Sequence, residues 1–151
     1  MIHHISIPAR EPRHVAELLV ELFDGHLTGF GPYPNCYIAW VGDGFGTAIE
    51  VFPVGTEMVP DSGNGQANFR HRAGSAPFTA THAAISVEKD RAAILALAAR
   101  EGWRAIELPR GPNNVIEFWI ENAVMLELMT PDMAHDYMAA AQRYRAHEAH
   151  T

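Results

Sequence analysis

Two histidine-led stretches decide the fold of this chain: HISI at residues 4–7 and HAAISV at residues 82–87. In the first stretch His4 and Ser6 alternate with two isoleucines, which is the period of a β-strand that has one apolar face. The second stretch has the same character, and His82 stands 78 residues after His4.

Two glutamate-bearing stretches repeat at nearly the same distance. IEVFP at residues 49–53 and LELMTP at residues 126–131 each enclose a glutamate between aliphatic residues, and Glu127 stands 77 residues after Glu50. A glycine that ends a predicted helix lies between the histidine and the glutamate each time, at Gly25 and at Gly102. Landmarks that recur in one order at one spacing indicate that the chain contains the same unit twice.

Each unit is predicted to run strand, helix and three strands, and the fold class is therefore α+β. In the first half the stretch 27–35 is rich in glycine and proline, so that any strand there is brief or lies at a sheet edge. The predicted strands are 2–9, 36–41, 46–54, 81–87, 103–108, 114–121 and 123–129, and the predicted helices are 11–24 and 89–101.

The domain organisation follows from the same pattern. We expect one domain over 1–151, with a first module at about 1–54, a linker at about 55–79, a second module at about 80–131 and a C-terminal helix at 132–148. The linker is rich in Gly, Asn, Ser, Arg and Pro and has little periodicity, which is typical of a connector or of a mobile flap over a pocket.

The bulk composition excludes several classes of protein. A chain of 151 residues with 48% hydrophobic content can form a packed core, and a net charge of −7 with scattered basic residues argues against a nucleic-acid partner. A single cysteine, Cys36, excludes an internal disulfide and a thiolate-rich zinc site. Neither a signal peptide nor a membrane span is visible, so we expect a cytoplasmic protein without a membrane partner.

The repeated polar residues are of metal-ligand types. On its strand, each of the two histidines and two glutamates points to the face opposite the aliphatic residues that would pack under a helix. A glutamate enclosed by aliphatic residues is costly to bury unless a cation or hydrogen-bond donors pair with it. Two imidazoles and two carboxylates form a nitrogen and oxygen set that suits Fe(II), Mn, Co, Ni or Zn. The predicted metal ligands are His4, Glu50, His82 and Glu127.

A βαβββ unit that occurs twice, with His on the first strand and Glu on the last strand of each copy, resembles the vicinal oxygen chelate superfamily. That group contains glyoxalase I, extradiol dioxygenases, methylmalonyl-CoA epimerase and bleomycin-resistance proteins. The resemblance covers residues 2–131 and implies two modules whose mixed sheets curl around a cup, with a metal in the cup held at the four positions named above. It also implies a homodimer, a common state in the superfamily.

The resemblance implies a metal-dependent enzyme, and it leaves the reaction open. The first expectation is a glyoxalase-like lyase or isomerase whose small-molecule substrate chelates the metal through two adjacent oxygens, with Glu50 or Glu127 as the catalytic proton shuttle. A second is a ring-cleaving Fe(II) dioxygenase, if Glu50 is not a ligand. The non-enzymatic alternative is a protein that sequesters a drug or metabolite, although bleomycin-resistance relatives lack the metal ligands.

Other polar residues are less favoured as metal ligands or site residues. His3 would replace His4 as the ligand if the strand register shifted by one residue. Glu117 is expected at a solvent-facing or rim position, with a role as a pocket acid as the alternative. The tail histidines His135, His147 and His150 are expected to decorate an exposed helix.

Overall fold

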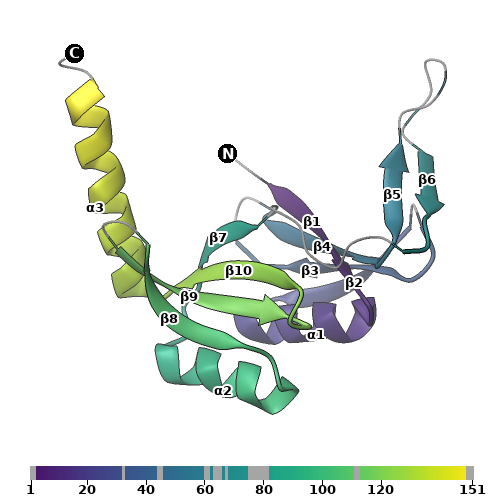
Figure 1. Ribbon diagram of the computed structural model, residues 1–151, viewed down its shortest axis with the longest axis horizontal. Coiled ribbons are helices and arrows are strands. Elements are labelled where there is room, and N and C mark those ends of the chain that lie inside the picture. The colour runs from purple at the N-terminus through teal and green to yellow at the C-terminus, as the bar shows by residue number, and fades with distance from the viewer. Residues whose placement is uncertain are drawn as a thin grey trace. The chain divides into compact units, whose positions relative to one another are not determined.

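The computed structural model describes residues 3–31, 33–43, 46–59, 62, 66, 68–74, 82–110 and 113–148, and the side chains of these except at 30, 59, 110 and 141–148. The chain divides into two compact units, Met1–Thr79 and Ala80–Thr151. Each unit contains a four-stranded mixed sheet and a helix that packs on it, and the elements are labelled in Figure 1.

The first unit begins with strand, helix and three strands. Its sheet has the order β1-β4-β3-β2, in which β1 runs parallel to β4 and the other pairs are antiparallel. The glycine-rich stretch forms β2 at the edge of this sheet, as the sequence predicts. The elements are β1 (His4–Ala9), α1 (Pro12–Phe23), β2 (His26–Phe30), β3 (Cys36–Trp40) and β4 (Ala48–Pro53).

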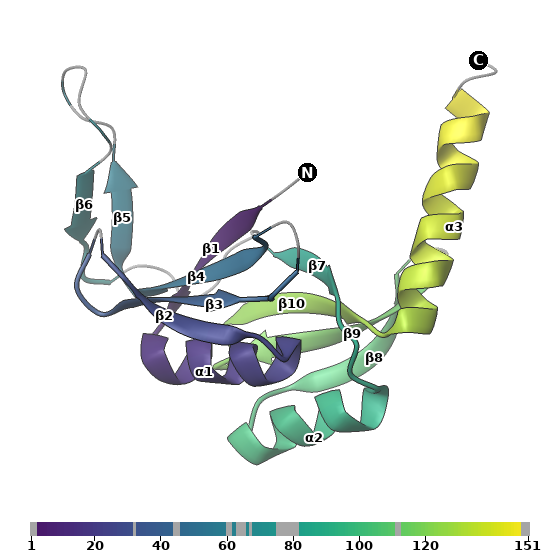
Figure 2. The same cartoon turned by 180° about the vertical axis from the view of Figure 1, so that it is seen from behind.

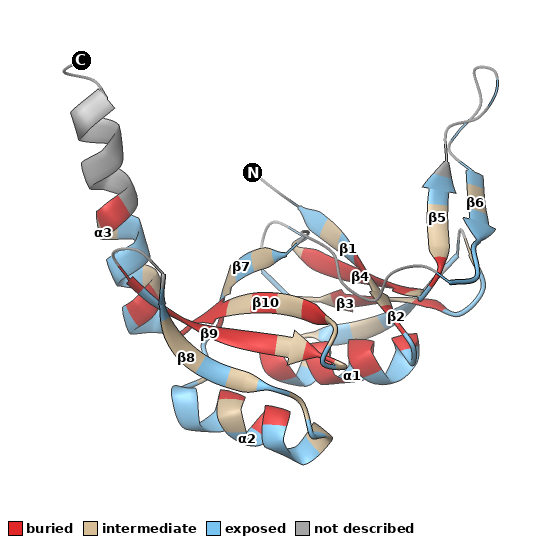
Figure 3. Ribbon diagram, in the orientation of Figure 1, coloured by how far each residue is buried: buried red, intermediate tan, exposed pale blue. Residues whose placement is uncertain are grey.

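Helix α1 covers one face of this sheet in both views (Figures 1 and 2). It starts with Pro12, whose missing N–H costs nothing in a first turn, and it ends at Asp24, which adopts a left-handed φ of 52°. Between them a helical stripe is buried against the sheet, and Figure 3 shows this inward side in red. The stripe consists of Val15, Ala16, Leu18, Leu19 and Leu22.

The second unit repeats this topology. Its sheet has the order β7-β10-β9-β8, in which β7 runs parallel to β10 and the other pairs are antiparallel. The Asp90 side chain caps the helix by accepting a hydrogen bond of 2.8 Å from the Ala93 N–H, and Gly102 ends the helix with a φ of 69°. The elements are β7 (Ala83–Ser86), α2 (Arg91–Glu101), β8 (Ala105–Arg110), β9 (Asn113–Ile120) and β10 (Val124–Met129).

The predicted fold class is confirmed. Two βαβββ modules with mixed sheets occur in the predicted order, and a C-terminal helix, α3 (Pro131–Glu148), follows and contacts β9 and β10. No helix in the described part of the chain is long and apolar enough to cross a membrane.

The segment predicted as a linker contains a β-hairpin that the sequence analysis did not predict. Strands β5 (Thr56–Val59) and β6 (Asn68–His71) pair antiparallel, and residues 75–79 lie outside the described part of the chain. Phe69 stacks on Phe52 of the main sheet with ring centroids 5.6 Å apart. The hairpin starts at Gly55, whose φ of 87° suits glycine and whose carbonyl accepts a hydrogen bond from the Arg72 N–H.

Candidate metal-binding residues

In the first unit the structure brings His4 and Glu50 together. Strands β1 and β4 pair so that Ser6 lies opposite Glu50, which places His4, Ser6 and Glu50 on the sheet face away from α1. Glu50 Oε1 lies 3.7 Å from His4 Nε2, which is too long for a hydrogen bond. Glu50 Oε2 accepts a hydrogen bond of 2.8 Å from the Ser6 hydroxyl. Glu50 is buried, with 9% exposure, whereas the His4 side chain is 57% exposed.

The surroundings of Glu50 on this face are mostly apolar. Ile38 of β3 lies opposite Glu50 and is buried. The buried thiol of Cys36, two residues before Ile38, has a raised pKa, first because burial disfavours the thiolate and second because the Glu50 charge repels it. Trp40, two residues after Ile38, donates a hydrogen bond of 2.9 Å to the Thr28 hydroxyl. No Lys or Arg side chain of the described residues forms an ion pair with Glu50.

In the second unit Glu127 keeps the register of Glu50, whereas His82 lies just before β7. Glu127 of β10 lies opposite Ala84 of β7, and His82 stands two residues before Ala84. In the first unit His4 likewise stands two residues before Ser6, the partner of Glu50. The two glutamates therefore hold matching positions of their sheets. Each histidine stands two residues before the partner of its glutamate, His4 within β1 and His82 just before β7, although the sequence spacings differ by one residue.

Glu117 does not lie at the solvent-facing position that the sequence analysis expected. It lies opposite Glu127 in the β9–β10 ladder, is only 8% exposed, and accepts a hydrogen bond of 3.2 Å from the Trp119 indole N–H. The reason is the strand period of two, which places Glu117 on the same face as Val115 and Trp119. The structure therefore adds a second carboxylate beside Glu127.

The remaining histidines of the sequence analysis fall in three situations. His3 precedes β1 and is exposed, and its carbonyl accepts a hydrogen bond of 2.9 Å from the Ala48 N–H. His135 is exposed on α3 and lies 3.6 Å from Asp136. The side chain of His147 and the whole of His150 lie outside the described residues.

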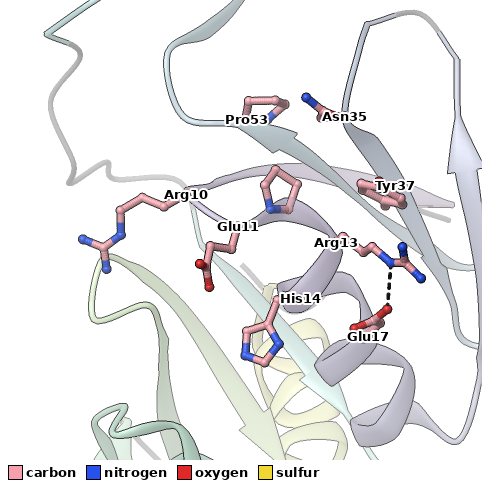
Figure 4. Close-up of a pocket in the computed structure, with 9 residues that line it drawn as sticks. Arg10, Glu11, Arg13, His14, Glu17, Asn35, Tyr37 and Pro53 are labelled. Carbon is pink, nitrogen blue, oxygen red and sulfur yellow. Dashed lines mark hydrogen bonds and ion pairs between the residues drawn. The ribbon is translucent and has the colours of Figure 1, made fainter.

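A pocket in the first unit lies elsewhere. Its volume is about 530 Å³, and its lining includes Arg10, Arg13 and His14 near the start of α1 and Tyr37 and Pro53 of the sheet (Figure 4). Arg13 is already paired with Glu17 at 2.9 Å. A second pocket of about 560 Å³ is lined by residues 29, 31 and 33–37. Neither pocket is lined by any of the four predicted metal ligands.

Among the residues that the structure describes, no group of three or more His, Cys, Asp or Glu side chains is arranged to hold a metal ion. The four predicted ligands are divided equally between the two units, so that neither unit contains three of them. Each unit by itself supplies one histidine and one glutamate, and the two glutamates are in matching register.

Comparison with known proteins identifies the fold. No family model matches the sequence, and no curated protein matches it either. A solved structure of the fosfomycin resistance protein FosX from Mesorhizobium loti is 14% identical, with a TM-score of 0.53 and coverage of 86% of this chain and 90% of that chain. FosX from Listeria monocytogenes, complexed with Mn(II) and sulfate, is 13% identical, with a TM-score of 0.56 and coverage of 86% and 89%. A glyoxylase/bleomycin resistance protein/dioxygenase domain from Frankia sp. EAN1pec is 15% identical, with a TM-score of 0.52 and coverage of 86% and 96%. The chain thus has the fold of the vicinal oxygen chelate superfamily, as the sequence predicts.

Proposed function

We propose that this protein is a metal-dependent enzyme whose small-molecule substrate binds the metal through two adjacent oxygens. The observation that carries the proposal is the matched register of Glu50 and Glu127 in the two units, with a histidine two residues before the strand partner of each glutamate. A duplicated sheet has no structural need for a polar pair at the same position in both copies, since an apolar side chain would serve the sheet equally well. A shared ligand is the simplest reason for the recurrence.

The contacts of Glu50 support a cation as that ligand. A buried carboxylate is stabilised when its oxygens meet donors or a positive charge. Glu50 has the Ser6 hydroxyl at one oxygen and the His4 imidazole, at 3.7 Å, beside the other. With metal–ligand bonds of about 2.0–2.2 Å, two ligand atoms of one ion lie at most about 4.4 Å apart. The separation of His4 Nε2 and Glu50 Oε1 is within that limit, so these residues fit a divalent ion.

The metal and the substrate class are proposed from the relatives. FosX from Listeria monocytogenes has been solved with Mn(II) and sulfate, and a mutant of it with Mn(II) and 1S,2S-dihydroxypropylphosphonic acid. The second ligand carries hydroxyl groups on neighbouring carbon atoms, which is the vicinal oxygen arrangement that the sequence resemblance implies. Mn(II) is therefore the first metal to test, ahead of Fe, Ni, Co and Zn.

The roles proposed for the chain's own residues follow from their types. His4, Glu50, His82 and Glu127 would hold the metal, which supplies Lewis acidity when bound. Glu50 and Glu127 are the groups proposed to move a proton at a substrate carbon, as in a lyase or isomerase. Closure of the two sheets into a cup, within one chain or across a homodimer, belongs to the same proposal.

Elemental analysis and metal titration test the proposal. Protein purified without added metal, or titrated with Mn(II), should bind about one equivalent per chain. Glu50→Gln, His82→Ala and Glu127→Gln should each weaken binding strongly, whereas His135→Ala, at an exposed position on α3, should not. Equal loss in His135→Ala would contradict the placement of the site. Absence of metal binding together with tight binding of a flat organic molecule would favour the sequestering function instead.

The reaction class can be tested separately on the metal-loaded protein. A lyase or isomerase should exchange a substrate hydrogen with deuterium next to a carbonyl group, which NMR detects. A ring-cleaving oxygenase should consume dioxygen in the presence of a catechol. Deuterium exchange without oxygen consumption is the result that we expect.

A further inference from the structure

We infer that Ser6 is a positioning residue that holds the Glu50 carboxylate with one oxygen turned toward His4. The inference rests on the proposed function, because it concerns how a metal-ligating Glu50 is oriented. Ser6 is an exposed serine in an edge strand, and no motif singles it out in the sequence.

The two oxygens of Glu50 have different neighbours. Ser6 lies directly opposite Glu50 in the parallel β1–β4 pair, and its hydroxyl donates to Oε2 at 2.8 Å. Oε1 faces His4 Nε2 at 3.7 Å. The terminal torsion of a glutamate side chain is broad, so the side chain alone does not fix where each oxygen points. The hydrogen bond from Ser6 supplies that restriction.

The other neighbours of Glu50 cannot take over this role. Ile38, on the opposite side of Glu50, has no polar side-chain atom. The Cys36 thiol is oriented toward the Pro34 carbonyl, with 3.9 Å between sulfur and oxygen. Among the described residues, Ser6 is therefore the side chain that donates a hydrogen bond to Glu50.

The second unit shows that the sheet does not require a hydroxyl at this position. Ala84 occupies the position of Ser6, and β7 pairs with β10 in the same register without it. Glu127 instead has Glu117 opposite it on the neighbouring strand β9, at the position where Glu50 has Ile38. A role for Ser6 in forming the strand is thus unnecessary, which leaves its contact with Glu50 as the reason for a serine.

Mn(II) affinity of the full chain, measured by calorimetry, tests the inference. Ser6→Ala should weaken Mn(II) binding by about 10–100-fold, the usual effect of removing a residue that orients a metal ligand. Ser6→Thr keeps the hydroxyl and should bind nearly as tightly as the wild type. Ser86→Ala is the matched control, because it removes a hydroxyl from the corresponding edge strand β7 of the second unit. This control should leave the affinity unchanged.

A double-mutant cycle separates positioning from a general structural effect. If Ser6 acts through Glu50, Ser6→Ala should cause no further loss of Mn(II) affinity in a Glu50→Gln background that still binds measurably. Thermal unfolding without metal shows whether each variant is folded. Wild-type affinity in Ser6→Ala, or the same loss in Ser6→Thr as in Ser6→Ala, would overturn this inference alone. Failure of the wild type to bind any divalent metal would overturn the proposed function and the inference with it.

Discussion

Replacing Glu50 by methionine should make the metal-free protein more stable. Methionine has a similar length and no charge, and Glu50 sits beside buried Ile38 with only 9% of its surface exposed. Burying a methionine side chain contributes about 1.5–3 kcal/mol, and losing the hydrogen bond from Ser6 costs about 1.5 kcal/mol. Relief of the carboxylate burial adds to the gain, so that we expect a net stabilisation of about 2 kcal/mol.

Metal should reverse this order. For a chain of this length, about 2 kcal/mol corresponds to a rise in Tm of about 4–8 °C for Glu50→Met without metal. Mn(II) at a hundred times its Kd should add about 2.7 kcal/mol to the wild type and nothing to a variant that cannot bind it. The wild type should then become the more stable of the two proteins.

Thermal and urea unfolding of both proteins, in EDTA and in Mn(II), measure these differences. Glu127→Met is a useful comparison, because Glu127 is less buried than Glu50 but faces Glu117, so that its replacement reports relief of carboxylate repulsion as well as burial. The reasoning is refuted if Glu50→Met destabilises the metal-free protein. In that case the contacts with Ser6 and His4 would already compensate the buried carboxylate, and no cation would be needed to explain it.

Three further predictions concern other residues. Gly25→Ala should destabilise the protein by about 3 kcal/mol in urea unfolding, because its Cβ would lie 1.8 Å from the Trp40 carbonyl oxygen, whereas Gly29→Ala meets nothing within 4 Å and should cost far less. Burial, and secondly the Glu50 charge, raise the pKa of the Cys36 thiol in the folded protein, so the unfolded chain loses this proton first as the pH rises. The wild type should therefore lose stability relative to Cys36→Ala above about pH 8.5, and parallel pH profiles of the two proteins would contradict this. The hydrogen bond from the neighbouring threonine hydroxyl lowers the pKa of Asp132 at the start of α3. The wild type should therefore be more stable than Asp132→Asn above about pH 4 and lose this difference at lower pH, as measured by acid unfolding.

The duplicated topology could be predicted from the sequence because its landmarks are local. A histidine at the start of an apolar strand, a glycine after a helix and a glutamate between aliphatic residues are each visible within a few residues. Their repetition gives the number and order of the elements without any knowledge of strand pairing. The β5–β6 hairpin has no such landmarks, because its strands have only four residues each. The contact that ties it to the main sheet, the stacking of Phe69 on Phe52, joins residues that are far apart in the sequence.

The position of Glu117 could not be predicted because it depends on strand register. The alternation of β9 shows which residues share a face, but it does not show which face meets solvent. The pairing is not visible in the alternation either: the turn after β9, where Glu121 and Asn122 take φ values of 50° and 53°, brings β10 back with Glu127 opposite Glu117. Ser6 was missed for the same reason, since its importance appears only when Glu50 is known to lie opposite it.

The two copies of the unit have kept their register and changed the neighbours of the glutamate. Glu50 lies between Ser6 on one neighbouring strand and Ile38 on the other. One of its oxygens accepts a hydrogen bond from Ser6, and the neighbour on the other side is apolar. Glu127 lies between an alanine and a second carboxylate, which is itself tied by an indole N–H. Like charges directly opposite each other across a ladder repel, and the proposed divalent cation would offset that repulsion if it binds there. The first unit thus places a hydroxyl donor beside its glutamate, and the second places another carboxylate there, so the two glutamates differ in their nearest polar neighbours and are not interchangeable.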